Sequence, residues 1–91
     1  MGWTIEYAAS IRRSARKLSP EVRERIRVFL EERLAPLEDP RQLGVPLRGT
    51  QFEDLWRYRV GDYRIIVRIE DVCRAVLVLI IAHRRDVYRR R

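Results

Sequence analysis

Four arginines in the stretch "DLWRYRVGDYRIIVRIED" (residues 54–71) are the side chains with the clearest capacity for chemistry. Arg57 and Arg59 precede a Gly-Asp pair, and Arg64 and Arg68 follow it. A guanidinium group keeps its charge at any working pH, and its fork of N–H donors fits the oxygens of a phosphate. The array therefore predicts contact with a polyanion.

The charge of the whole chain supports this interpretation. Twenty basic residues against 13 acidic ones give a formal net charge of +7. Residues 57–91 hold ten of the basic side chains and only four of the acidic ones, a balance of +6 in little more than a third of the chain. A positive field concentrated in one half favours a polyanionic partner, most simply nucleic acid or an acidic protein.

Alternation of side chains predicts where the four arginines lie. Gly61-Asp62 is typical of a two-residue hairpin loop, which would join strands 55–60 and 63–70 and set Arg59 opposite Arg64. One face of the hairpin would then carry apolar and aromatic side chains, as a core does, and the arginines would line the other, open face. Like charges directly opposite each other are destabilising, so the Arg59–Arg64 pair favours an anion between them.

The remaining segments predict the elements around this hairpin. "WTIEY" alternates with a period of two, as a strand does, and two amphipathic helical stripes follow, the second one starting at Ser19-Pro20 with a serine cap. A proline- and glycine-rich loop leads to the hairpin, and residues 74–84 form a last, central strand that ends in His83, Arg84 and Arg85. We expect an α+β fold, a four-stranded sheet with both helices on one face, and one domain over residues 1–91.

Composition excludes several other classes of protein. A single cysteine, Cys73, and a single histidine leave no internal disulfide and no ordinary zinc site, so we expect neither metal nor cofactor. The first ten residues lack the pattern of a secretory leader, and the longest apolar run, residues 75–82, is too short to span a bilayer. These features predict a soluble, cytoplasmic protein without a membrane partner.

Taken together, several short motifs resemble the RelE/ParE superfamily of toxins from bacterial and archaeal toxin–antitoxin pairs. The motifs are "LRG" (47–49), "LWR" (55–57), "GDYR" (61–64), "HRR" (83–85) and "VY" (87–88). The resemblance implies a four-stranded, mainly antiparallel sheet with two helices on one face and an open basic concavity on the other. It also implies a partner, an antitoxin whose acidic segment folds on binding.

Two activities occur on this fold. RelE-type members cleave mRNA in the decoding (A) site of the ribosome, where the ribose 2′-hydroxyl attacks the adjacent phosphate and leaves a 2′,3′-cyclic phosphate. ParE-type members inhibit DNA gyrase instead. The RelE-like activity, a metal-independent endoribonuclease, is our leading expectation. The alternatives are a ParE-like gyrase inhibitor and a non-catalytic module that binds RNA or an antitoxin.

The resemblance also implies roles for individual residues. Arg84 matches an arginine used at the leaving group, and Tyr88 matches a tyrosine that stacks near the attacked nucleotide. Arg48 matches the basic residue of the loop before the glycine. The expected catalytic residues are Arg57, Arg59, Arg64, His83, Arg84 and Tyr88, and the expected RNA-binding residues are Arg48, Arg68 and Arg85.

The sequence departs from the family where a general base is needed. Arg57 and Arg59 stand where the best-known RelE has lysines, and an arginine cannot take the proton of the 2′-hydroxyl. Three interpretations stay open. His83, with an ordinary pKa of about 6.5, is the base; the arginines act through geometry and charge alone; or the chain does not cleave RNA.

Overall fold

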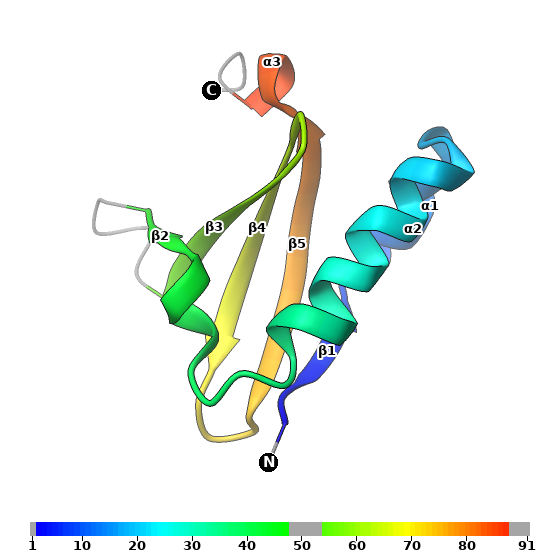
Figure 1. Ribbon diagram of the computed structural model, residues 1–91. Coiled ribbons are helices and arrows are strands. Elements are labelled where there is room, and N and C mark those ends of the chain that lie inside the picture. Colours follow the sequence, from blue (N-terminus) through cyan, green and yellow to red (C-terminus); the bar gives the residue numbers. More distant parts are fainter. Residues whose placement is uncertain (1, 48–53, 88–91) are drawn as a thin grey trace.

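The computed structural model describes residues 2–47 and 54–87, which form a five-stranded sheet with a pair of helices against one face (Figure 1). The strands are β1 (Thr4–Tyr7), β2 (Val45–Pro46), β3 (Leu55–Val60), β4 (Tyr63–Glu70) and β5 (Ala75–His83), in the order β1-β5-β4-β3-β2. The α+β class is confirmed. The expected number of strands was too low by one, since β2 lies within the stretch read as a loop.

The hairpin forms as its sequence predicts. Strands β3 and β4 have the expected bounds, and Gly61 has a φ of +58°, a conformation that a hairpin turn needs and that glycine adopts without strain. The register pairs Val60 with Tyr63 and Arg59 with Arg64. Strand β5 pairs antiparallel with β4 and parallel with β1, so it is the central strand that its apolar sequence indicates.

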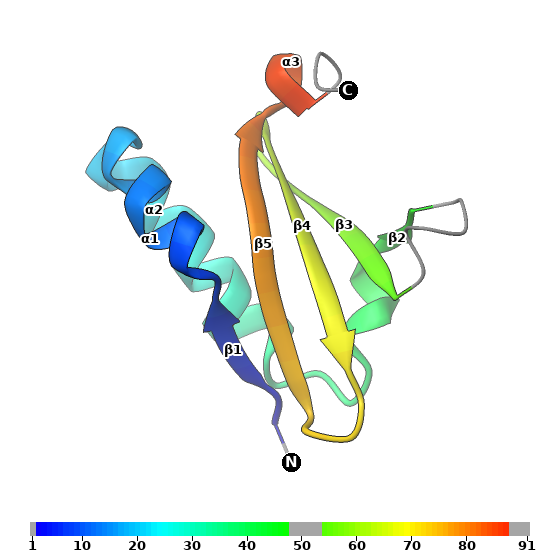
Figure 2. The ribbon, with the colours of Figure 1, turned by 180° about the vertical axis from the view of Figure 1, so that it is seen from behind.

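The helical layer consists of α1 (Ala9–Ser14), a 3-10 turn η1 (Ala15–Lys17), α2 (Pro20–Val28) and a π-helical continuation η2 (Phe29–Leu34). Figures 1 and 2 both show α1 and α2 side by side on the same side of the sheet. The predicted cap of α2 is present, because the Ser19 hydroxyl accepts the N–H of Val22 at 3.2 Å and Pro20 occupies the first turn.

The core lies between this layer and one face of the sheet. Leu30 and Leu34 of η2 are fully buried, as are Ile65, Val67 and Val78 on β4 and β5. Tyr58 joins them at 1% exposure, and Trp56, Val60 and Tyr63 pack at the margin. The apolar face of the hairpin is therefore the covered face, as the alternation predicts. No helix among the described residues is long and apolar enough to cross a membrane.

Candidate functional site

The four hairpin arginines lie on the face of the sheet opposite the helices, and we call this surface the arginine face (Arg57, Arg59, Arg64, Arg68). Arg59 and Arg64 are direct cross-strand neighbours in the register of β3 and β4. Arg59 and Arg68 are exposed, and Arg57 is half-buried. The placement follows from alternation alone, because each arginine is an odd number of residues away from a core side chain.

Arg64 differs from its neighbours because its side chain is largely covered, with only 8% of its surface exposed. Its Nη1 donates to the carbonyl oxygens of Gly61 at 3.3 Å and Tyr63 at 3.2 Å. The expectation of a fully open face is therefore wrong at Arg64. The Gly61 and Tyr63 carbonyl oxygens offset the charge repulsion between Arg64 and Arg59. Through the same hydrogen bonds the Arg64 guanidinium stabilises the hairpin turn.

Arg84 and Arg85 lie at the same end of the molecule as this turn. They open a short helix, α3 (Arg84–Val87), which both views place beside the β3–β4 turn (Figures 1 and 2). The Arg84 N–H donates to the Asp62 carbonyl oxygen at 2.8 Å, so the start of α3 is tied to the turn. Both arginine side chains are exposed. This end of the sheet therefore gathers Arg59, Arg64 and Arg84 from three different elements.

His83 does not join that cluster, contrary to the sequence-based expectation. It pairs with Tyr63 across β4 and β5 and so lies on the face with the core, where its ring meets the Tyr63 ring edge-on at 5.4 Å. The cause is a β-bulge: Val67 pairs with Val78 but Ile66 pairs with Ile80, which leaves Leu79 as an extra residue. One extra residue moves every later side chain of β5 to the opposite face.

The remaining expected residues divide into two groups. Arg68 and Arg85 are exposed on β4 and α3, where a polyanion can reach them. Arg48 and Tyr88 lie outside the residues that the structure describes. The structure thus brings together Arg59, Arg64 and Arg84, keeps Arg57 and Arg68 on the same face, and separates His83 from all of them by the thickness of the sheet.

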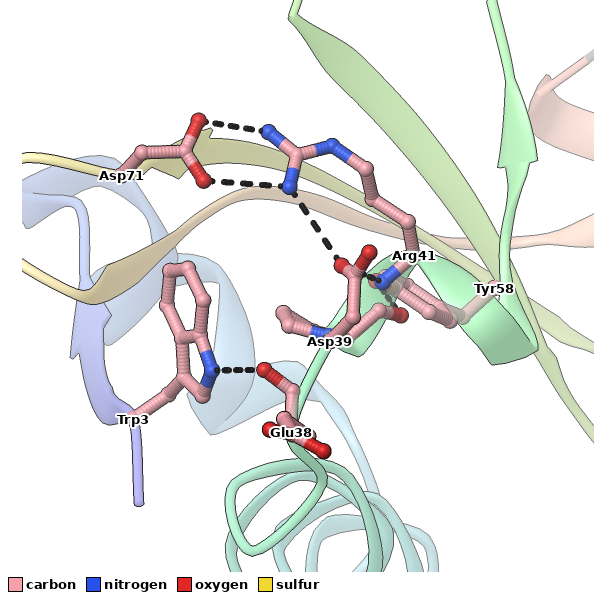
Figure 3. A network of polar contacts seen from close by, with 7 residues as sticks. Trp3, Glu38, Asp39, Arg41, Tyr58 and Asp71 are labelled. Atoms are coloured by element: carbon pink, nitrogen blue, oxygen red, sulfur yellow. Dashed lines mark hydrogen bonds and ion pairs between the residues drawn. The ribbon is translucent and has the colours of Figure 1, made fainter. Parts of the chain in front are cut away.

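A polar network that the sequence did not indicate holds the far end of this sheet. Arg41 donates to both carboxylate oxygens of Asp71, at 3.1 and 2.8 Å, and to Asp39 at 3.3 Å (Figure 3). Its guanidinium also lies over the Trp56 ring, 5.8 Å from the centroid. Arg41 belongs to the 3-10 turn η3 (Pro40–Leu43), so the network fixes the segment that leads into β2.

The same segment reaches the arginine face through β2, whose Val45 pairs with Arg57. Two hydrogen bonds hold the start of this segment: Trp3 Nε1 donates to the Glu38 carbonyl oxygen at 3.1 Å, and the Tyr58 hydroxyl donates to that of Pro40 at 2.7 Å. The only local signal in the sequence is Asp39-Pro40, where the Asp39 carboxylate accepts the Arg41 N–H. Nothing in the sequence near Arg41 predicts Asp71, thirty residues away.

The Arg41–Asp71 contact predicts a pH dependence of stability. The hydrogen bond from Arg41 holds the pKa of Asp71 below its ordinary value. The contact therefore stabilises the folded protein fully above about pH 4, the ordinary pKa of an aspartate. This stabilisation is lost as the pH falls through the lowered pKa of Asp71 in the folded state. We expect Asp71→Asn to lower the urea midpoint at pH 7, and the difference from wild type to shrink below about pH 3.

The matched control for this measurement is Glu6→Gln, because Glu6 is exposed and no ion pair involves it within residues 2–47 and 54–87. Its urea midpoint should follow that of the wild-type protein at both pH values. A deficit of Asp71→Asn that keeps its size at low pH would show that the carboxylate charge is not the source of the stabilisation.

The arrangement has chemical limits as well as capacities. In the part of the chain that the structure describes, no group of three or more His, Cys, Asp or Glu side chains is placed to hold a metal ion. The arginine face offers cationic hydrogen-bond donors, which bind phosphate oxygens and stabilise negative charge on them.

Comparison with known proteins identifies the family. The family profile described as "ParE toxin of type II toxin-antitoxin system, parDE" matches residues 4–88. Toxin RelG of Mycobacterium tuberculosis is 32% identical over 90 residues, which are 99% of this chain and 100% of RelG.

Solved structures agree with the sequence comparison. The toxin–antitoxin complex RelBE2 of M. tuberculosis contains a chain with a TM-score of 0.80 and 28% identity, aligned over 91% of this chain and 92% of that one. A double arginine-to-alanine mutant of the E. coli toxin RelE, in the free state, gives a TM-score of 0.72 at 25% identity, over 98% and 93% of the two chains. The chain described here belongs to the ParE toxin family of type II toxin–antitoxin systems, within the RelE/ParE superfamily.

Proposed function

We propose that this toxin is a RelE-like, ribosome-dependent mRNA endonuclease of the cytoplasm and that a cognate antitoxin neutralises it. The observation that carries the proposal is the gathering of Arg59, Arg64 and Arg84 at one end of the sheet, on the face opposite the helices. The exposed guanidinium groups of Arg59 and Arg84 suit one phosphate and the charge that develops on it, and the buried Arg64 holds the turn between them. The likeness to RelG and RelE toxins supports RNA as the anion.

In the proposed reaction, the 2′-hydroxyl oxygen of one nucleotide forms a bond to the adjacent phosphorus and the bond from phosphorus to the 5′-oxygen breaks. The products are a 2′,3′-cyclic phosphate and a 5′-hydroxyl. Arg59 is exposed and contacts the non-bridging oxygens, and Arg84 stabilises the departing 5′-oxygen. Arg64, anchored on two carbonyl oxygens, fixes the turn between them. The 2′-hydroxyl proton passes to solvent, since the arginines cannot accept it, and the departing 5′-oxygen takes a proton from solvent to become the 5′-hydroxyl.

The test is to incubate purified toxin with mRNA in a translation extract and with the same mRNA free of ribosomes, and then to map the RNA ends. We expect cleavage only on ribosomes, with fragments that end in a 2′,3′-cyclic phosphate. Such fragments lack a free 3′-hydroxyl, so they should accept a poly(A) tail only after the terminal phosphate has been removed enzymatically. Intact mRNA in both samples would contradict the proposal.

A ParE-like inhibition of DNA gyrase is the second candidate. Two observations favour it: the matching family profile carries the ParE description, and residues 57 and 59 are arginines, which cannot act as a base. A gyrase supercoiling assay with the same protein preparation separates the two functions. Loss of supercoiling together with intact mRNA would establish the second candidate in place of the first.

The position of His83 yields a prediction about the mechanism. Because His83 lies across the sheet from Arg59 and Arg64, and its Nδ1 accepts the Arg85 N–H at 3.3 Å, it contacts α3 and not the proposed substrate. We expect His83→Asn, which keeps a hydrogen-bond acceptor but no base, to cleave within about threefold of the wild-type rate.

The pH profile gives the stricter comparison for His83. Without a protein base on the arginine face, the logarithm of the cleavage rate should rise steadily from pH 6 to 8 in the wild type and in His83→Asn alike. A plateau toward high pH in the wild type, absent from His83→Asn, would show that His83 takes the proton after all.

A further inference from the structure

His83 ends β5 and stands directly before Arg84, so it occupies the cap position of α3. The first N–H groups of a helix have no partner within the helix and need an acceptor from outside it. At the second position of α3 this acceptor is an imidazole, because the Arg85 N–H donates to His83 Nδ1 at 3.3 Å. His83 therefore has the role at α3 that the Ser19 hydroxyl has at the start of α2.

Two hydrogen bonds from outside α3 hold the backbone on both sides of Arg84. The Arg84 N–H donates to the Asp62 carbonyl oxygen at 2.8 Å, and the next N–H, that of Arg85, donates to His83. Because a peptide unit is planar, a hydrogen bond to its N–H restrains the orientation of the whole unit. The peptide units before and after the Arg84 Cα atom are both restrained, and together they set the direction in which the Arg84 side chain leaves the backbone.

Tyr63 connects this cap with Arg64. Its ring meets the His83 ring edge-on, with the centroids 5.4 Å apart and an interplanar angle of 81°. Its carbonyl oxygen accepts a hydrogen bond from Arg64 Nη1 at 3.2 Å. Groups on the covered face of the sheet therefore support two arginines of the opposite side, Arg64 through a carbonyl oxygen and Arg84 through the imidazole of His83.

We propose that His83 is a positioning residue for Arg84: its imidazole caps α3 and so directs the Arg84 guanidinium towards the phosphate that Arg59 contacts. The catalytic consequence rests on the proposed function, whereas the cap is independent of it. A displaced donor stabilises the developing negative charge less well, and a displacement of about 1 Å can lower a rate about 100-fold.

Two other roles for His83 make different demands on its side chain. A general base would have to reach the 2′-hydroxyl, yet the ring lies on the opposite face and Nδ1 already accepts the Arg85 N–H. Packing against Tyr63 would require a side chain of this size and no acceptor atom. The positioning role requires an acceptor at the place of Nδ1, and it requires neither a base nor a ring.

Three substitutions of His83 separate these roles. The side-chain oxygen of His83→Asn can occupy the place of Nδ1, and asparagine is among the best helix caps. His83→Gln is the matched control, because it has the same amide with its oxygen one bond farther out, at the place of Nε2, and so misses the Arg85 N–H. His83→Leu keeps an apolar side chain against Tyr63 without an acceptor. None of the three variants has a base.

The first measurement follows the exchange of the Arg85 N–H with water by NMR at pH 7.5, above the usual titration range of an imidazole. We expect wild type and His83→Asn to agree within about twofold. In His83→Gln and His83→Leu the exchange should be at least about fivefold faster, because this N–H has lost its acceptor. Equal exchange in wild type, His83→Asn and His83→Gln would overturn the cap and the proposal with it.

The second measurement is the single-turnover cleavage rate on programmed ribosomes over a range of ribosome concentrations. We expect His83→Gln and His83→Leu to lower the maximal rate about 10-fold and to leave the half-saturating concentration within about twofold. His83→Asn should stay within about threefold of the wild-type rate, since it restores the cap.

The other outcomes of this comparison overturn the positioning role. Equal losses in all three variants would indicate a base, a loss that spares only His83→Leu would indicate packing, and wild-type rates throughout would show that Arg84 does not depend on the cap. An inactive wild-type protein that still shows the expected exchange pattern would defeat the proposed function and support the cap.

Discussion

Replacement of Arg84 with alanine should lower the rate of ribosome-dependent mRNA cleavage about 100- to 1,000-fold, the loss seen when one donor to a developing oxyanion is removed. Arg84 opens α3 with its N–H bound to the Asp62 carbonyl, which places it beside the turn that carries Arg59 and Arg64. The side chain is exposed, so the fold should survive the change. The measurement is the single-turnover cleavage rate on programmed ribosomes.

Arg85→Ala is the matched control, because Arg85 is the next residue, is also exposed and carries the same charge. A residue that contacts only a distant phosphate should lower affinity modestly and reduce the salt slope by about one. Equal, modest losses of cleavage rate in the two variants, each restored by lower salt, would mean that Arg84 only binds a phosphate and is not catalytic. A steep loss confined to Arg84 would identify it as a catalytic residue.

The arginine hairpin was predictable because its signals are local. Alternation and the Gly61-Asp62 loop fix both strands, and a two-residue loop leaves a single register, so Arg59 had to face Arg64. The capped start of α2 at Ser19-Pro20 is local in the same sense, since the hydroxyl that caps the helix lies three residues from its partner N–H.

The position of His83 was not predictable, because it depends on a single extra residue in another part of the strand. Without the bulge at Leu79, alternation from Ala75 would have placed His83 on the arginine face. Leu79 lies in a continuous run of apolar residues, so no change in the sequence pattern indicates which residue forms the bulge. The burial of Arg64 likewise follows from two carbonyl oxygens of the folded turn and from no pattern in the sequence.

The network around Arg41 shows the same limit over a longer range. Asp39-Pro40 indicates a turn, but the contacts of Arg41 with Asp71 and Trp56 join segments that meet only in the folded chain. Strand β2 was missed for a related reason: two residues that include Pro46 carry no alternation, and their pairing with β3 depends on where η3 is held. These contacts hold the segment that leads into β2, whose Val45 pairs with Arg57.

The second large effect concerns Tyr58, which links the core to the edge strand. Only 1% of its surface is exposed, and the centroid of its ring lies 5.8 Å from that of the Phe29 ring. Its hydroxyl donates a hydrogen bond to the Pro40 carbonyl at 2.7 Å. We expect Tyr58→Ala to lower the free energy of unfolding by about 3–5 kcal/mol, as removal of a buried aromatic ring does. Tyr58→Phe should lose about 1–2 kcal/mol, because it leaves the Pro40 carbonyl without its donor.

Urea unfolding monitored by the fluorescence of Trp3 and Trp56 measures both changes, with Arg59→Ala as the control on the same strand. Arg59 is exposed and faces Arg64, so its removal should change stability by no more than about 0.5 kcal/mol, or raise it slightly. Domains of this size have about 5–14 kcal/mol in total, so Tyr58→Ala should unfold at markedly lower urea. A loss below about 1 kcal/mol would mean that η3 and β2 are held independently of Tyr58, so Tyr58 would not link the core to the edge strand.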